Sequence, residues 1–377
     1  MNTSETLASH SSVGQLSWLN HPLTRAATRI GFEAEALSYF VEKINPLWSL
    51  TSMKARVERV VDETHDVKTF VLRPNAHWQG ISAGQHIGVA VEIDGVIHKR
   101  RYSLSKAEAT DESANEAVQI TVKRVPNGVV SNHFYEQVQV GDVIGLDAAD
   151  GDFVLQAELP SQLLVLTAGS GITPVFSQVA TLLAAGYKGS IEFVHYVRTP
   201  DDCIFGQQLH QLAEQHDNLE VQWCYEDAKG QEGPKRFGGK QIKKSVSDYK
   251  ERHTLLCGPA GFMTAVREHW DDLGLNESLS FEYFGAPPMD AKDAIDTEIT
   301  LKTGKQIRLR AGETILDSLI ANGETPKYGC KRGVCHECKC RKTSGAVKNL
   351  LTGNVSGSGE EYIQLCISAP VSSVTLA

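Results

Sequence analysis

Four cysteines near the C-terminus have the types and spacing of a metal site. Cys330, Cys335 and Cys338 follow the pattern C-x4-C-x2-C, and Cys366 follows after 27 further residues. This is the plant-type pattern for a two-iron, two-sulfur (2Fe-2S) cluster, in which each iron takes two thiolates. Four thiolates also satisfy zinc, but zinc sites more often combine two C-x2-C pairs, and this stretch has one. The pattern favours an iron–sulfur cluster, with Cys340 interpreted as a buried or free thiol outside the ligand set.

The segment KRRYSLS, residues 99–105, and a second segment farther along suit a flavin. An Arg-x-Tyr-Ser or Arg-Tyr-Ser arrangement at a strand end offers a guanidinium for a pyrophosphate, an aromatic ring for the isoalloxazine and a hydroxyl near its reactive nitrogen. In VKRVPNGVVSNHF, Gly128 to Ser131 would open a helix whose free N–H groups meet phosphate. A plain turn into a helix that Ser131 merely caps is the alternative. The two segments together favour a flavin.

Two glycine-containing turns predict a dinucleotide site. In LLVLTAGSGITPVFS, a buried strand leads through Gly169 and Gly171 into a helix, with Thr173 as its cap and Pro174 at its first position. This is not the G-x-G-x-x-G fingerprint, but the glycines let the backbone approach a pyrophosphate at a helix N-terminus. In LLCGPAGF, Cys257 ends another strand that would face the same edge of the sheet. From these residues alone, a small core residue is an equally good interpretation of Cys257.

Periodicity divides the chain into domains that could position these groups. Residues 51–158 alternate like short strands, as in QHIGVAVEI, and predict an antiparallel barrel. Residues 159–284 alternate continuous apolar runs with helical stretches, which predicts a doubly wound α/β domain around a parallel sheet. Residues 285–295, rich in Pro, Ala and Asp, are expected to form a linker, and residues 296–377 a small third domain.

Residues 1–50 are expected to form a helical extension before the barrel. Ahead of Pro46, which would end the helix, apolar residues recur at the spacing of one helix face: Leu37, Phe40, Val41 and Ile44. We expect this face to pack on the barrel, and docking on a membrane or on a partner protein is the alternative.

Composition and charge limit the class of protein. The 377 residues, 41% hydrophobic and 22% charged, suffice for several globular domains. No apolar run approaches the roughly 20 residues that cross a bilayer, and no basic-then-apolar leader is present, so a cytoplasmic location is expected. Residues 296–377 hold eleven Lys/Arg against eight Asp/Glu, whereas the remainder holds 26 against 38. The basic residues around the cysteines are expected to offer a docking patch for an acidic partner or an anionic membrane surface: Lys331, Arg332, Lys339, Arg341 and Lys342.

Taken in order, RYSLS, AGSGITP, CGP and the C-terminal cysteines resemble the ferredoxin–NADP reductase superfamily, in the form that carries a fused plant-type ferredoxin domain. The resemblance covers about residues 53 to 377. It implies a multidomain fold: an antiparallel Greek-key β-barrel for FAD, a doubly wound α/β nucleotide domain and a β-grasp ferredoxin domain. Within the superfamily, INPLWSL and LRPNAHWQGISAGQHIGVAVEIDG look like the reductases that supply membrane fatty-acyl (stearoyl-CoA type) desaturases.

The resemblance implies a role for each matching residue. Arg101 would hold the FAD pyrophosphate, Tyr102 would stack on the isoalloxazine, and Ser103, followed by Leu104, would lie by its N5 atom. A second phosphate contact would come from Gly128, Val129, Val130 and Ser131. The nicotinamide nucleotide would bind at Gly169, Ser170, Gly171, Ile172, Thr173, Pro174, Cys257, Gly258 and Pro259. Glu282 and Phe284 would lie near the flavin, and the implied catalytic residues are Ser103, Cys257 and Glu282.

The nucleotide preference depends on the residue after the second strand of the α/β domain. HYVRTPDD places Arg198 there, where it could pair with a 2′-phosphate, and no acidic residue at the strand tip would hold a free ribose. We therefore expect NADPH. NADH remains the alternative, because an Arg at this position also occurs in NADH users of the superfamily.

Together these features predict an NAD(P)H-dependent oxidoreductase. A nicotinamide gives two electrons as hydride and a 2Fe-2S cluster takes one, so FAD would convert between the two. The expected acceptor is a membrane di-iron desaturase of fatty-acyl-CoA, which the chain would meet at the cytoplasmic face of the membrane. The alternatives are an aromatic-ring hydroxylase or other monooxygenase as acceptor, and a redox sensor in place of an enzyme. No nucleic-acid partner is expected.

Overall fold

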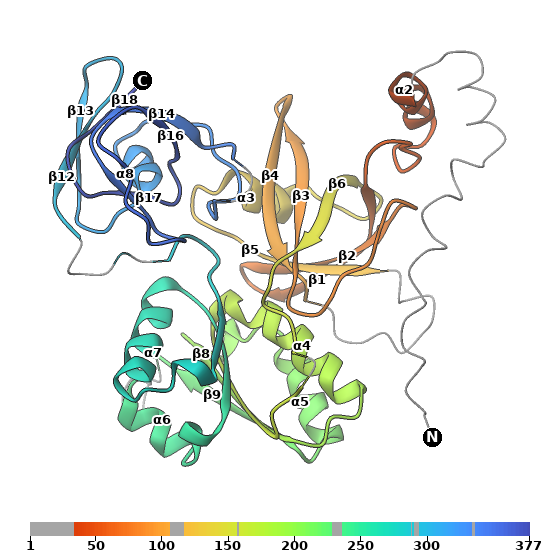
Figure 1. Ribbon diagram of the computed structural model, residues 1–377. Helices are drawn as coiled ribbons and strands as arrows, with labels where there is room; N and C mark the ends of the chain where they lie inside the picture. Colours follow the sequence, from red (N-terminus) through yellow and green to blue (C-terminus); the bar gives the residue numbers. More distant parts are fainter. Residues whose placement is uncertain are drawn as a thin grey trace, which may run out of the picture.

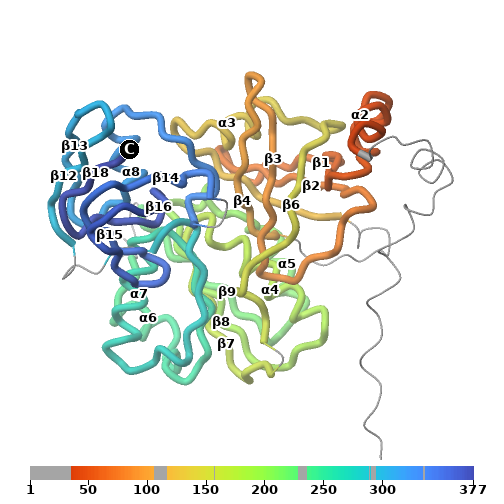
Figure 2. The backbone as a smooth tube through the Cα atoms, turned by 45° about the horizontal axis from the view of Figure 1, so that its top comes forward, coloured from red at the N-terminus to blue at the C-terminus, as the bar shows by residue number. Residues whose placement is uncertain are grey.

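The computed structural model describes residues 34–105, 117–156, 158–227, 236–287, 289, 294–333 and 336–377. They form a β-barrel, an α/β domain and a small C-terminal domain, in that order (Figure 1). In both views the C-terminal domain lies beside the barrel and above the α/β domain (Figure 1, Figure 2). No helix among these residues has the length and apolarity needed to cross a membrane.

The barrel consists of antiparallel strands around an apolar interior. Its elements are β1 (Lys54–Thr64), β2 (Val67–Pro74), β3 (His86–Ile93), β4 (Val96–Ser103), β5 (Val118–Lys123), β6 (Val143–Asp150) and helix α3 (Val129–Glu136). The strands pair in the order β4-β3-β6-β1-β2-β5, and a bridge between Leu104 and Ile120 joins the first to the last and closes the barrel. Fully buried Phe70 and Phe134 fill its core with edge-to-face rings 5.1 Å apart. The antiparallel Greek-key barrel is confirmed.

The α/β domain has a parallel sheet with helices on both faces. Its elements are β7 (Gln162–Ala168), α4 (Ile172–Ala184), β8 (Ser190–Val197), α5 (Gly206–Gln215), β9 (Leu219–Tyr225), α6 (Gly239–Ser245), β10 (His253–Cys257), α7 (Ala260–Asp272) and β11 (Leu279–Glu282), with short 3-10 turns at Gly169–Gly171, Pro200–Asp202, Tyr249–Glu251 and Asn276–Ser278. Helices α4 and α5 cover one face, and α6 and α7 cover the other. The order β11-β10-β7-β8-β9 confirms the doubly wound fold. From β7 the chain adds β8 and β9 on one side of the sheet, and it then adds β10 and β11 on the other side. A ligand crevice is expected where this strand order reverses, at the carboxyl ends of β7 and β10.

The C-terminal domain is a mixed sheet with one helix packed against it. Its elements are β12 (Thr297–Thr300), β13 (Gln306–Leu309), α8 (Ile315–Ala321), β14 (Lys339–Ser344), β15 (Val347–Asn349), β16 (Glu361–Gln364), β17 (Ser368–Pro370) and β18 (Val374–Leu376). The main sheet has the order β13-β12-β18-β14-β16, and β15 pairs with β17. Ile315, Leu316 and Leu319 of α8 pack into the same core as Cys338 and Cys366, so the fold brings the distant cysteine to the cysteine-rich loop.

Helix α2 (Ala34–Ile44) is linked to the barrel by an ion pair. Ser38 is buried, and Glu42 pairs with Lys54 of β1 at 2.8 Å. Phe40 and Ile44 are 60% and 77% exposed. The expectation that the apolar face packs on the barrel is therefore wrong for these two residues, because Glu42 faces Lys54 of the barrel and the Ser38 hydroxyl accepts from the Leu50 N–H just after the helix.

Candidate active site

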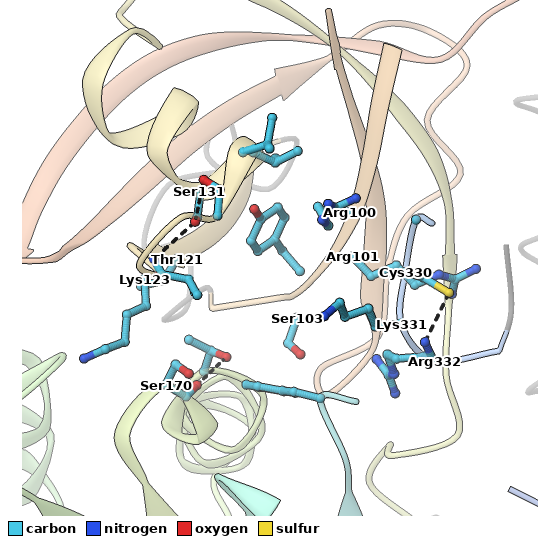
Figure 3. A pocket seen from close by; sticks show the side chains of 18 of the residues that line it. Arg100, Arg101, Ser103, Thr121, Lys123, Ser131, Ser170, Cys330, Lys331 and Arg332 are labelled. Atoms are coloured by element: carbon cyan, nitrogen blue, oxygen red, sulfur yellow. Dashed lines mark hydrogen bonds between the residues drawn. The ribbon is translucent and has the colours of Figure 1, made fainter. Parts of the chain in front are cut away.

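A cavity of about 370 Å³ lies where the three domains meet, and its walls carry some of the residues that the sequence predicted, whereas Cys257, Glu282 and Arg198 are not among its lining residues. Figure 3 shows Lys123 and Ser131 on one side, Ser170 below, and Arg100, Cys330 and Arg332 on the opposite side. The barrel contributes Arg100, Arg101, Tyr102, Ser103, Thr121, Lys123, Val125, Gly128, Val129, Val130 and Ser131. The α/β domain contributes Ser170, Thr173 and Phe284, and the C-terminal domain contributes Tyr328, Gly329, Cys330, Lys331 and Arg332.

The two arginines of β4 have different surroundings. Arg101 pairs with Asp150 at 2.9 Å and contacts the His86 ring, and its guanidinium holds the pKa of Asp150 below the usual range. Arg100 donates to a backbone carbonyl and lies 4.9 Å from the Tyr328 ring. Alternation along a strand also puts Arg100 on the same face as Tyr102. These contacts favour Arg100, the first residue of the Arg-x-Tyr-Ser arrangement, over Arg101 as the guanidinium available to a pyrophosphate.

Tyr102 and the start of α3 form the barrel side of the cavity. The Tyr102 ring lies 5.8 Å from the Phe134 ring, and burial raises the pKa of its hydroxyl, which stays protonated. Gly128 is the residue before α3, so the N–H groups of the first helical turn face the cavity mouth without intrahelical partners. Ser131 accepts from the Val125 N–H at 3.2 Å and so braces the turn before the helix, but it is not the cap, because Gly128 holds that position with no side-chain hydrogen bond. Val130 and Leu104 are buried and belong to the barrel core.

The two nucleotide turns touch each other at the predicted edge of the sheet. A Cβ added to Gly171 would lie 2.4 Å from the carbonyl oxygen of Cys257, so only glycine permits this approach. Gly169 adopts φ +52°, a conformation that favours glycine. Helix α4 begins at Ile172, and Thr173 lies within its first turn and donates to the Ser170 carbonyl, so the prediction that Thr173 is the cap is wrong. The side chains of Ile172 and Pro174 are buried, which leaves the backbone to meet a ligand.

Cys257 and Glu282 lie side by side at the ends of β10 and β11. Cys257 is fully buried, and burial raises the pKa of its thiol well above the usual value. Its thiol is therefore neutral, and its side chain is not among those that line the cavity. Gly258 is buried, Pro259 is exposed, and Phe284 is 37% exposed at the cavity rim.

Glu282 is contacted by residues of the barrel and of the C-terminal domain. Its carboxylate accepts from the Ser103 hydroxyl at 3.3 Å and from Arg332 at 2.9 Å, and the Nδ1 atom of His86 lies 3.3 Å away. Burial raises the pKa of Glu282, but the neighbouring His86 and Arg332 outweigh burial and leave it below the usual value. A buried carboxylate therefore stays ionised beside Ser103, at the barrel side of the cavity.

The cysteine-rich loop has the chemistry of a cluster site. Cys330, Cys338 and Cys366 are buried, and a hydrogen bond from the Cys366 thiol lowers the pKa of Cys338 to about 6. Cys335 lies outside the described residues. Lys331 and His336 adopt left-handed φ values of 55° and 57°, strained for residues other than glycine, and such strain is common where a loop must wrap a ligand. These thiols fit a 2Fe-2S cluster.

The basic residues around the cysteines do not form one open patch. Lys342 is fully buried and donates to the carbonyls of Gly357 and Gly359, and Arg332 is turned inward to Glu282. Lys331 and Arg341 are paired with Asp317 and Glu360 within the same domain, and Lys339 lies over the Tyr362 ring. The expected docking patch is therefore wrong for Arg332 and Lys342, because both satisfy polar groups inside the protein.

Some residues that line the cavity were not predicted as part of the site, among them Thr121, Lys123 and Tyr328. His86, whose Nδ1 atom lies 3.3 Å from Glu282, was missed as well. His86 pairs directly with Ser103 across β3 and β4, and Lys123 ends β5 just before the turn into α3. The strand alternation around KRRYSLS, once extended to its neighbouring strands, is the signal that could have identified them.

These domains and their shared cavity define a class, a flavin-dependent oxidoreductase with a nicotinamide-nucleotide domain and an iron–sulfur domain. Three family models match: the oxidoreductase FAD-binding domain over residues 54–155, the oxidoreductase NAD-binding domain over residues 165–268, and the 2Fe-2S iron-sulfur cluster binding domain over residues 299–371. The chain belongs to the ferredoxin–NADP reductase family, in the form that carries a 2Fe-2S domain.

Relatives of known name share this whole arrangement. The NADPH oxidoreductase of Mycobacterium tuberculosis is 32% identical over 350 residues, which cover 93% of this chain and 90% of the relative. The glycine betaine monooxygenase reductase subunit of Chromohalobacter salexigens is 29% identical over 371 residues, covering 90% and 99%. The solved structure of phthalate dioxygenase reductase has the same fold, with a TM-score of 0.56 at 23% identity, and the match covers 86% of this chain and 98% of that one.

Proposed function

We propose that this chain takes hydride from NADPH and passes the electrons one at a time through FAD and a 2Fe-2S cluster to a separate oxygenase-type protein. The observation that carries the proposal is the single cavity lined by the flavin segment, the nucleotide turn and the cluster loop. Arg100, Tyr102, Ser103 and the start of α3 would hold the FAD, the turns at Gly169–Gly171 and at Cys257 would hold the nucleotide, and the four cysteines would hold the cluster.

The protein would act mainly by positioning. FAD, when bound, supplies the conversion of a two-electron hydride into single electrons. The glycine turns would orient the nicotinamide over the flavin side of the cavity, and close, aligned reactants account for much of the rate in such reactions. The neutral Cys257 thiol would exclude water there, and the Ser103 hydroxyl, fixed by Glu282, would lie beside the flavin as a hydrogen-bonding group.

NADPH is proposed as the donor over NADH. Arg198 follows β8 and is 58% exposed, so it can reach a 2′-phosphate at the nucleotide edge. It pairs with Asp202 at 3.3 Å, and that carboxylate would have to release it. The name of the Mycobacterium tuberculosis relative, an NADPH oxidoreductase, agrees with this preference.

The finer proposal for the acceptor is a membrane fatty-acyl desaturase. It is supported by the resemblance of the segments INPLWSL and LRPNAHWQGISAGQHIGVAVEIDG to desaturase reductases. An aromatic-ring hydroxylase or other monooxygenase is the second candidate, and the name of the Chromohalobacter salexigens relative, a monooxygenase reductase subunit, favours it.

Reconstitution distinguishes these acceptors. The purified holoprotein is mixed with NADPH and either membranes that contain a fatty-acyl desaturase or a soluble ring-hydroxylating oxygenase, and the oxidised product is measured. The desaturase proposal predicts product with the membranes, whereas product with the soluble oxygenase alone would transfer the function to the second candidate. Rapid reduction of both artificial acceptors, ferricyanide and cytochrome c, is expected in either case, and slow turnover with both would contradict an electron-transfer enzyme and favour a sensor.

A further inference from the structure

One carboxylate, that of Glu282, is shared by the three domains. It belongs to β11 of the α/β domain, accepts from Ser103 of the barrel, and forms an ion pair with Arg332 of the cluster loop at 2.9 Å. The Glu282 side chain is 4% exposed and that of Arg332 is 18% exposed. The flavin side of the cavity and the cluster loop therefore meet at a nearly buried ion pair.

Arg332 is connected to the cluster site as well as to the flavin side. It comes two residues after Cys330, and its backbone N–H donates to the Cys330 sulfur at 3.3 Å. Its guanidinium reaches out of the C-terminal domain, whereas neighbouring basic residues such as Lys331 and Arg341 pair within that domain. One residue thus contacts a proposed cluster ligand through its backbone and Glu282 through its side chain.

We propose that Arg332 is a positioning residue, whose ion pair with Glu282 holds the cluster loop against the flavin cavity and so sets the rate of electron passage between them. This inference rests on the proposed function. Each hydride carries two electrons and the cluster takes one at a time, so the second passes after an acceptor has reoxidised the cluster. Both passages need the same close approach of the loop.

This ion pair suits a positioning role because the loss of either partner destabilises the buried site that the two residues share. Removing one partner from a buried, hydrogen-bonded pair leaves the other charge uncompensated in a low-dielectric site. Without Arg332, Glu282 would keep His86 and the Ser103 hydroxyl as partners on the barrel side but would have no partner on the cluster loop, so water entering between the domains would stabilise it. Another contact across this boundary is that of the Arg100 guanidinium with the Tyr328 ring, 4.9 Å from the ring centroid. The fraction of molecules in which the cluster loop lies against the cavity is therefore expected to fall when an uncharged residue replaces Arg332.

The test compares two rates in the same holoprotein. Wild type, Arg332→Gln, Arg332→Lys and Arg341→Gln are mixed anaerobically with NADPH, and absorbance follows flavin and cluster reduction. We expect Arg332→Gln to slow cluster reduction relative to flavin reduction about tenfold, because a modest shift in a two-state population changes a gated rate by that order. Arg332→Lys should recover part of the rate. Arg341→Gln, which removes the same charge from a surface pair of the same domain, should match wild type.

A second readout does not depend on turnover. Hydrogen exchange of the segment 328–333 should be faster in Arg332→Gln and also in Glu282→Gln, with no further increase in the double variant, since both changes break one pair. This measurement decides the matter if Arg332→Gln fails to assemble its cluster, because Glu282→Gln leaves the amino-acid sequence of the cluster loop unchanged.

Several outcomes would overturn the proposal. They are a wild-type ratio of the two rates in Arg332→Gln, an equal loss in Arg341→Gln, or unchanged exchange of the segment 328–333 in Glu282→Gln. Each would leave the proposed function intact as long as the wild-type cluster is reduced by NADPH. A wild-type cluster that NADPH does not reduce would instead refute the proposed function.

Discussion

Cys366→Ser is expected to abolish cytochrome c reduction while ferricyanide reduction by NADPH persists. Cys366 is 3% exposed and hydrogen-bonds with Cys338, so a serine there removes one of the four proposed ligands. Mutation of residues that only hydrogen-bond to metal ligands lowers metal affinity or activity about 10- to 100-fold. Loss of a ligand itself should therefore lower cytochrome c reduction by more than about a hundredfold. Flavin reduction takes place on the other side of the cavity, and ferricyanide should accept electrons directly from the flavin. Steady-state assays with the two acceptors measure the difference.

Cys340→Ser is the matched control for this variant. Cys340 lies two residues past Cys338, and its thiol faces the backbone carbonyl of Arg341 at 3.8 Å. The Cys340→Ser variant should keep the visible spectrum of the cluster and the wild-type rate of cytochrome c reduction. Equal loss in both variants, or loss of the flavin from Cys366→Ser, would contradict separate flavin and cluster domains.

Gly171→Ala is expected to lower kcat/KM for NADPH strongly without unfolding the protein. The added Cβ would lie 2.4 Å from the carbonyl oxygen of Cys257, and a backbone atom cannot move aside cheaply. The two nucleotide turns would separate, at a cost of about 1–3 kcal/mol, which corresponds to roughly a fivefold to 150-fold loss in kcat/KM. Initial rates of ferricyanide reduction against NADPH concentration give the value.

Gly261→Ala is the control in the neighbouring turn. Gly261 lies near the start of α7, close to Cys257 in sequence, and a Cβ there would meet no atom within 4 Å. Alanine favours a helix over glycine by about 1 kcal/mol, so this variant should keep its activity and unfold at the same or a higher temperature. If Gly171→Ala retained wild-type kcat/KM, the close contact of the turns would have no part in nucleotide binding.

The sequence predicted well the features that depend on patterns of neighbouring residues. Strand alternation identified the barrel, continuous apolar runs identified the parallel sheet, and the glycine turns fell at its carboxyl edge, as with Gly171 after β7. Cys338 and Cys366 lie in one core even though 27 residues separate them. Each of these predictions follows from spacing along the chain and from the few ways in which strands and helices pack.

The features that the sequence could not supply depend on contacts between distant segments. Arg332 and Lys342 were predicted as surface charges, because no residue close to them in the sequence indicates their buried acceptors, the Glu282 carboxylate and the Gly357 carbonyl. The outward orientation of Phe40 on α2 has the same origin, since the polar contacts of that helix with the barrel come from a different part of the chain. Side chains that bridge domains are found only once the domains are docked.

Anaerobic titration of the full-length holoprotein with NADPH, followed by visible absorbance and EPR, tests the central claim most directly. The proposed electron path predicts that the flavin absorbance bleaches and that the EPR signal of a reduced 2Fe-2S cluster appears in the same titration, with NADH needing a higher concentration for the same change. A flavin that bleaches while the cluster stays oxidised, or a protein that holds zinc in place of iron, would contradict it.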